Sequence, residues 1–323
     1  MNELLFNLLV AGAVLFGMLN LAGGLIWVER RLLALFQDRL GPNRCGPFGL
    51  FIIVADIIKI FTKEDWIPPF ADKPVFILSP AIILLTALLS FTILPFAPGI
   101  MILDLNIGLL FFLGMSSMGI YSVVLGGWAS NNKFALLGGL RMSAQMFSYE
   151  VFMGLSILGV VTLAGSMNLR DIVEAQRGMW FIVPQFPAFI IFMLAAIAET
   201  HRLPFDMPEA ESELIAGFHS EYSSMKFGMF FVGEYVGVTL MSAVTVSLFF
   251  GGWLGPVLPP FVWFFLKTMA FVLFFILLRA ALPRPRYDQL LSIGWKILLP
   301  LALINLAVTG AIALMRGPAA PSV

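Results

Sequence analysis

Acidic side chains crowd into one short stretch of an otherwise apolar chain. The segment FDMPEAESEL, residues 205–214, contains Asp206, Glu209, Glu211 and Glu213, and it directly follows an apolar run long enough to cross a bilayer. On a helix over this segment Glu209 and Glu213 share one face, because they lie four residues apart. Two like charges so placed disfavour each other, and protonation of one relieves the repulsion. The spacing therefore predicts a pair of glutamates that changes protonation readily.

Part of this segment also has a purely structural interpretation. Asp206 is followed three residues later by Glu209, with Pro208 between them, and this spacing is typical of a capping box at a helix start. The helix dipole also favours acids in the first turn. The cap accounts for Asp206 but not for the later acids of the same loop, which include Glu221.

Further ionisable residues fall inside or beside apolar runs. Glu150, Glu199 and Glu234 lie in or near three of these runs, and Lys267 lies in a fourth. A charged group at mid-membrane costs about 2.5–3.5 kcal/mol on insertion scales, so such groups usually face a polar interior. We therefore expect Glu150 and Glu234 to mark an ion or proton route. Lys267 could equally snorkel or neutralise a neighbouring acid.

The chain has few residues that could hold a redox centre. His201 and His219 lie in one loop and show no metal-ligand spacing, and haem ligation by two histidines would require them on facing helices. Cys45 is the only cysteine, so the chain alone holds neither a disulfide nor an iron–sulfur cluster. The sequence predicts no metal or cofactor in this chain, and any redox centre belongs to partner chains.

Composition identifies lipid as the solvent of most of the chain. Of its 323 residues 60% are hydrophobic and 12% are charged, against roughly 45–50% and 25% in soluble domains. Formal net charge is zero, with 19 basic and 19 acidic residues, so bulk charge favours no nucleic-acid partner. The sequence predicts a polytopic membrane protein.

Apolar runs of about 20 residues, the length that crosses a ~30 Å hydrocarbon layer, predict the membrane spans. There are eight, at 4–28, 75–98, 103–127, 145–166, 180–200, 227–250, 260–281 and 294–315. Residues 48–61 are apolar but too short to cross, and Asp56 and Lys59 interrupt them, so they predict an interfacial helix. We expect one all-α transmembrane domain over residues 1–323.

Basic residues are distributed unequally between the two sets of loops. Fifteen lie in the loops after the first, third, fifth and seventh runs, and three lie on the other side. Because basic loops stay in the cytoplasm, the positive-inside rule places both termini outside. The long loops 29–74 and 201–226 are then cytoplasmic. Glu29 lies at the membrane boundary within reach of neighbouring arginines, which could line a polar entrance or serve only as topology anchors.

Five segments carry a resemblance to a known family: ERRLLALFQDRLGPNR, DIIKIFTKEDWIP, NNKFALLGGLRMSAQMFSYEV, RLPFDMPEAESELIAGFHSEYSSMKF and RPRYDQLLSIGWK. Together they resemble the H subunits of the bacterial proton-pumping NADH:quinone oxidoreductases, the counterparts of subunit 1 of mitochondrial complex I. The resemblance covers nearly the whole chain, and the first and fourth segments are the most specific. The eight predicted spans also fit that family.

The resemblance implies roles for particular residues. Glu29 and Arg30, with Arg279 as a weaker candidate, match the entrance of a quinone chamber that opens to the lipid. The acids that match the proton-coupling part of the family are Glu150, Asp206, Glu209, Glu211, Glu213, Glu221 and Glu234. Quinone reduction takes up two protons, and a charge change near the acidic loop would pass through Glu150 and Glu234 into the membrane.

The resemblance also implies cofactors, partners and location. Quinone is the substrate, whereas iron–sulfur clusters and FMN belong to partner subunits, and the chain is a component of a translocase that is not catalytic alone. The expected partners are the hydrophilic subunits at the quinone site, the small and antiporter-like membrane subunits, quinone and lipid, with no nucleic acid. The expected location is the bacterial inner (plasma) membrane, as a multi-pass protein.

Two other interpretations remain open from the sequence. One is the homologous membrane component of an energy-converting hydrogenase, which shares the core but serves no quinone; the intact GPNR and PEAESELIAGFHSEYSSMKF segments favour the quinone enzyme. The other is a stand-alone proton-coupled carrier, suggested by the acids within spans. Carriers often show repeated halves with broken helices, and the sequence has no such repeat.

Overall fold

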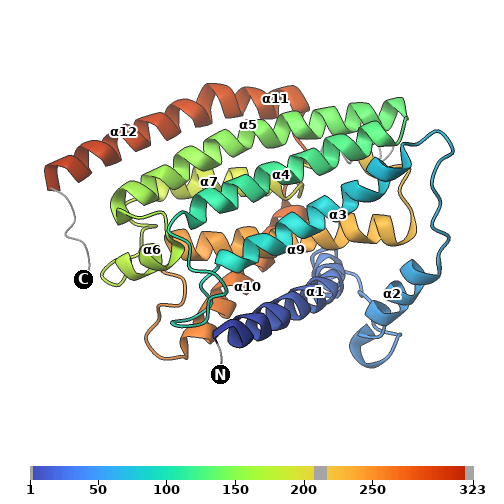
Figure 1. Ribbon diagram of the computed structural model, residues 1–323, viewed down its shortest axis with the longest axis horizontal. Coiled ribbons are helices and arrows are strands. Elements are labelled where there is room, and N and C mark those ends of the chain that lie inside the picture. The colour runs from blue at the N-terminus through green and yellow to red at the C-terminus, as the bar shows by residue number, and fades with distance from the viewer. Residues whose placement is uncertain (1–2, 207–216, 317–323) are drawn as a thin grey trace.

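The computed structural model describes residues 3–206 and 217–316, and within these ranges the chain is helical without a named strand (Figure 1). The α-helices are α1 (Glu3–Phe36), α2 (Ile52–Thr62), α3 (Lys73–Ser90), α4 (Gly108–Ala129), α5 (Lys133–Ala164), α6 (Leu169–Ala175), α7 (Phe186–Glu199), α9 (Ser224–Phe249), α10 (Pro260–Ala281), α11 (Tyr287–Ile293) and α12 (Leu299–Arg316). The predicted all-α fold is confirmed for these residues.

Seven helical segments among the described residues are long and apolar enough to cross a membrane. The remaining predicted span, 180–200, contains α7, which has 14 residues. At about 1.5 Å per residue α7 reaches roughly 21 Å, less than the ~30 Å hydrocarbon layer. Residues 181–185 form turns instead of helix, and Pro184 explains this because a proline disfavours helical backbone in the residue before it.

The helix α2 lies at the edge of the bundle, at the lower right in Figure 1, where it packs against α1 and α9. It has no buried residue, and it exposes Val54, Ile57, Ile58 and Phe61. The short helix predicted at 48–61 is thus present, and it begins four residues later than predicted. Its position at a membrane interface stays a prediction, which the exposed apolar side chains favour.

The helix α9 forms the centre of the bundle. Every residue from Val238 to Phe249 is buried, and α9 packs against α1, α3 and α10. Phe249 packs on Phe192 of α7, with ring centroids 5.6 Å apart. Because one helix touches so many neighbours, side chains of α9 can meet residues from distant parts of the chain.

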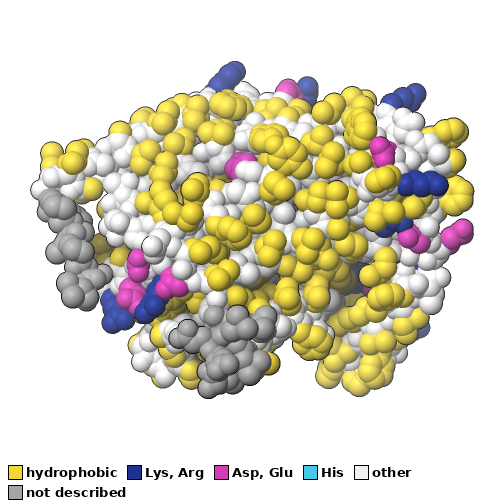
Figure 2. Space-filling model, viewed as in Figure 1, with side chains coloured by type: hydrophobic (Ala, Val, Ile, Leu, Met, Phe, Trp, Pro, Cys, Tyr) yellow, Lys and Arg dark blue, Asp and Glu magenta, His cyan; other side chains and the backbone are white. Residues whose placement is uncertain are grey.

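The loops lie at two opposite ends of the bundle. We call the end with the loops 37–72, 130–132, 200–206, 217–223 and 282–286 the basic end, because most lysines and arginines of the described residues lie at or near it. Hydrophobic side chains cover most of the face in Figure 2, and most of its charged side chains lie near the edges. This distribution fits a protein whose sides face lipid.

Lys267 of α10 closes the end opposite the basic end. Its ammonium group donates hydrogen bonds to the carbonyl oxygens of Phe250 at 2.7 Å, Gly252 at 3.2 Å and Leu254 at 2.7 Å. The Trp180 ring centroid lies 4.6 Å from the same nitrogen. These carbonyls follow the C-terminus of α9, where the helix dipole favours a cation. Among the described residues, the ammonium group of Lys267 is therefore bound by backbone carbonyls and not by an acid.

We predict that Lys267→Met destabilises the protein, because three carbonyls lose a charged donor. Hydrogen bonds to charged groups contribute about 1.5–3 kcal/mol, so we expect a loss of about 2 kcal/mol. Thermal unfolding in detergent measures the loss, with the exposed Lys296→Met as the matched control. Equal melting of the two variants would contradict this assignment.

Candidate functional site

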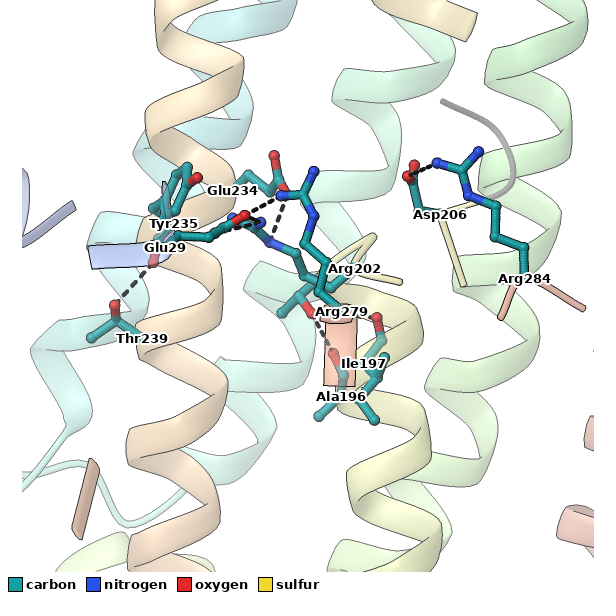
Figure 3. A network of polar contacts seen from close by, with 11 residues as sticks. Glu29, Ala196, Ile197, Arg202, Asp206, Glu234, Tyr235, Thr239, Arg279 and Arg284 are labelled. Atoms are coloured by element: carbon teal, nitrogen blue, oxygen red, sulfur yellow. Dashed lines mark hydrogen bonds and ion pairs between the residues drawn. The ribbon is translucent and has the colours of Figure 1, made fainter. Parts of the chain in front are cut away.

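Arg202 joins two buried carboxylates at the basic end. Its guanidinium lies 2.8 Å from an oxygen of Glu29 on α1 and 2.8 Å from an oxygen of Glu234 on α9. Arg279 of α10 also forms an ion pair with Glu29. Figure 3 shows these four side chains converging from separate parts of the chain. We call Glu29, Arg202, Glu234 and Arg279 the Arg202 cluster.

The ion pairs of the Arg202 cluster are largely shielded from solvent. The side chains of Arg202 and Glu29 are 6% and 4% exposed, and that of Glu234 is 17% exposed. Burial alone lowers the pKa of Arg202, but Glu234 and Glu29 outweigh it and raise that pKa above its ordinary value. Arg202 therefore stays charged, and its guanidinium also lies 4.4 Å from the ring centroid of Tyr235.

The loop that carries Arg202 is held at both ends by Gln145 of α5. α7 ends at Glu199, and His201 adopts a left-handed backbone with φ of 53°. Gln145 of α5 donates to the carbonyl oxygens of Ala198 at 3.2 Å and Phe205 at 3.0 Å, which flank the loop. These bonds hold the loop against α5, and the ion pairs of Arg202 with Glu29 and Glu234 join it to α1 and α9.

Asp206 lies beside the Arg202 cluster with a counter-ion of its own. Its carboxylate accepts a hydrogen bond from Arg284 at 2.9 Å (Figure 3). Burial raises the pKa of Asp206 more than Arg284 lowers it. The helix cap proposed for Asp206 involves Glu209, which lies outside the described residues together with Glu211 and Glu213.

Two cavities meet at Glu234. The first, about 140 Å³, is lined by charged and aromatic side chains that include Asp206, His219 and Arg279. The second, about 70 Å³, extends to Glu199 and Ser116. Each is large enough for water, because one water molecule needs about 10–15 Å³ of such volume.

Two more acids continue from the second cavity. Ser116 of α4 donates to Glu199 at 2.6 Å, and the adjacent Ser117 donates to Glu150 on α5. Neither acid forms an ion pair among the described residues. The structure thus brings Glu234, Glu199 and Glu150 near one another through α4, α5, α7 and α9.

Arg30 lies on another side of α1 from Glu29. It pairs with Asp56 of α2 at 2.7 Å, and its side chain is 41% exposed. Glu29 pairs with Arg202 and Arg279 instead of the adjacent Arg30, because successive helical residues point in different directions. Arg30 lines a third cavity of about 510 Å³ between α1, α2 and α9.

Glu221 lies away from the Arg202 cluster. It accepts a hydrogen bond from Asn132 at 2.7 Å, where α5 begins. The turn Gly217–His219 beside it packs closely on α5, since a Cβ on Gly138 would lie 2.7 Å from the Cα of Gly217. Glu221 therefore fixes the loop against α5 in this structure.

Sequence reasoning missed Arg202 and Arg284 as site residues. The sequence places both only among the basic loop residues, although Glu29 at a span boundary and Glu234 within a span require a cation nearby. That requirement is the signal that could have found Arg202. Among residues 3–206 and 217–316, no three His, Cys, Asp or Glu side chains cluster closely enough to hold a metal ion.

Fold and site together define a class: a multi-pass membrane protein with buried ionisable groups leading from one end into the helices. A protein-family model described as NADH dehydrogenase matches residues 8–310. The chain is 64% identical over 302 residues to the H subunit of NADH-quinone oxidoreductase from Methylococcus capsulatus (strain ATCC 33009 / NCIMB 11132 / Bath), and the match covers 93% of this chain and 96% of that relative.

The chain belongs to the family of the H subunits of NADH-quinone oxidoreductase, which are membrane subunits of complex I. The predictions of a multi-pass membrane protein and of a component of an oxidoreductase complex are thereby confirmed. Membership in such a complex also implies that other complex I subunits are its partners.

We predict that Arg202→Met strongly destabilises the protein, because it leaves Glu29 and Glu234 without their shared cation. Breaking a buried pair costs about 3–5 kcal/mol. Chemical unfolding in detergent measures the effect, and Arg30→Met is the matched control, since an exposed pair contributes about 0–1 kcal/mol. If both variants unfold at the same denaturant concentration, Arg202 does not hold the cluster together.

Proposed function

We propose that this chain helps to form the quinone chamber and couples quinone reduction to proton pumping through its buried acids. The observation that carries the proposal is the Arg202 cluster, which lies at the meeting point of two cavities and connects charged groups at the basic end with acids inside the helices.

The third cavity suits the path of a quinone from the lipid. It lies between α1, α2 and α9, and most of its lining is apolar, including Leu19, Ile53 and Val232. Arg30 and Asp56 supply a polar rim. An apolar tail and a polar head group need this combination, so Arg30 serves the chamber entrance, with Glu29 and Arg279 further inside.

Reduction of the quinone changes the protonation of the acids around it in this proposal. Reducing a quinone to a quinol takes up two protons. The first cavity shares Phe227 and Phe231 with the third, and its acids are Asp206 and Glu234. Because Arg202 and Arg279 fix the local charge, proton loss or gain at one acid changes the balance at the others. Glu209, Glu211 and Glu213 join this response from the acidic loop.

The proton route continues from Glu234 to Glu199 and Glu150. The second cavity connects the first pair, and the adjacent Ser116 and Ser117 bind the second pair. Acids inside a membrane usually mark such routes. Glu221 supports the loop from which the route begins.

The basic end faces the cytoplasm in this proposal, and both termini lie outside, as the distribution of basic residues favours. The host membrane is the bacterial inner membrane. The hydrophilic subunits that carry iron–sulfur clusters and FMN dock at the basic end, and small and antiporter-like subunits receive the proton-coupled change from Glu150.

We predict that Glu234→Gln lowers both quinone reductase activity and proton pumping in the assembled complex, by about tenfold or more, since proton-transfer groups contribute 10²–10⁴-fold in favourable cases. Glutamine keeps the shape but carries no exchangeable carboxyl proton. Activity and pumping are measured in proteoliposomes. Glu174→Gln, a partly exposed acid of α6, is the control, and wild-type values for both readouts in Glu234→Gln would overturn the proposed route.

We predict that Ile53→Trp obstructs the third cavity and raises the KM for quinone about tenfold, which corresponds to about 1.4 kcal/mol of lost binding. Ile53 lines this cavity, opposite Gly23 of α1. The neighbouring Val54→Trp is the matched control, because Val54 is exposed and does not line it. Steady-state kinetics with a soluble quinone measures KM, and equal KM values in the two variants would place the quinone path elsewhere.

A further inference from the structure

His201 forms part of the wall between the first and second cavities. Only Ile83, His201 and Glu234 line both cavities in the described part of the chain. Of these, Glu234 is bound to Arg202 at 2.8 Å, whereas Ile83 carries no proton. Within residues 3–206 and 217–316, His201 is therefore the one titratable side chain of this shared wall that forms no ion pair.

The imidazole of His201 is buried and incompletely bonded. The residue is 6% exposed, and its Nδ1 lies buried without a hydrogen-bond partner among the described residues. A buried polar atom usually has a partner, so one without is a candidate for a transient bond. The bonds from Gln145 to the carbonyl oxygens of Ala198 and Phe205 hold the backbone on either side of His201.

The surroundings of His201 keep its ring neutral. Burial, Arg202 and His219 lower the pKa of His201 to about 3. The groups that face it are Arg202, Asp206, His219, Glu234 and Arg279 from the first cavity and Glu199 from the second. A neutral imidazole has one nitrogen that accepts a proton and one that donates, so it can pass a proton on without storing charge.

We propose that His201 relays protons between the two cavities: one ring nitrogen takes up a proton from water or an acid on one side while the other nitrogen releases its proton toward the other side. The proton count of the ring is unchanged, and a flip of the ring about its Cβ–Cγ bond exchanges the two nitrogens and resets it for the next proton. This gives the route from Asp206 to Glu199 a second branch beside Glu234. The inference rests on the proposed function.

The test uses the assembled complex in proteoliposomes. His201→Asn keeps a polar side chain that tolerates the left-handed backbone but cannot relay a proton. We expect quinone-dependent proton pumping to fall at least about threefold. If Glu234→Gln lowers pumping while His201→Asn leaves it at the wild-type value, the His201 relay is overturned and the proposed function stands. If both variants pump like the wild type, the proposed function itself fails.

Chemical rescue separates a relay from a packing role. His201→Gly is compatible with the positive φ and leaves room for a small heterocycle. Added imidazole should restore pumping, whereas 1-methylimidazole has a similar shape but no N–H and should not restore it. Equal rescue by both compounds, or no rescue by imidazole, would show that His201 only fills space.

Discussion

The charge of Arg202 is the constraint on which the basic end depends. A guanidinium that is 6% exposed cannot lose its proton, so it needs carboxylates in contact, and Glu29 and Glu234 provide them from two membrane helices. Their positions fix how α1 and α9 approach the loop after α7. Arg279 adds a fourth segment, because it also pairs with Glu29. Arg202 and Arg279 thus bring together four segments: α1, the loop after α7, α9 and α10.

The same arrangement creates the conditions for coupling. In a medium of low dielectric, a change of protonation at one acid is felt strongly by the next. Glu234 touches Arg202 on one side and lines the cavity of Glu199 on the other. A site built only for stability would isolate such charges in apolar packing, whereas here two cavities give them access to water.

The sequence predicts the framework better than it predicts the site. Span 260–281 coincides with α10, and the short helix near 48–61 is present. Both could be predicted because the length of an apolar run, and the polar residues that interrupt it, are read from neighbouring residues. Charged residues inside or beside apolar runs also indicate Glu234 and Asp206 as candidate site residues. This local pattern does not reveal the partners of Glu29, since Arg202 and Arg279 lie 173 and 250 residues away along the chain. Only the folded bundle brings them together.

The most direct measurement is infrared difference spectroscopy of the assembled complex during reduction of bound quinone. If quinone reduction changes the protonation of Glu234, a carboxylic-acid C=O band should appear or disappear with quinol formation. That band should be missing from Glu234→Gln and shift in ¹³C-glutamate-labelled protein. A spectrum without any such band, or one that is unchanged in Glu234→Gln, would contradict the claim that the Arg202 cluster links quinone chemistry to proton movement.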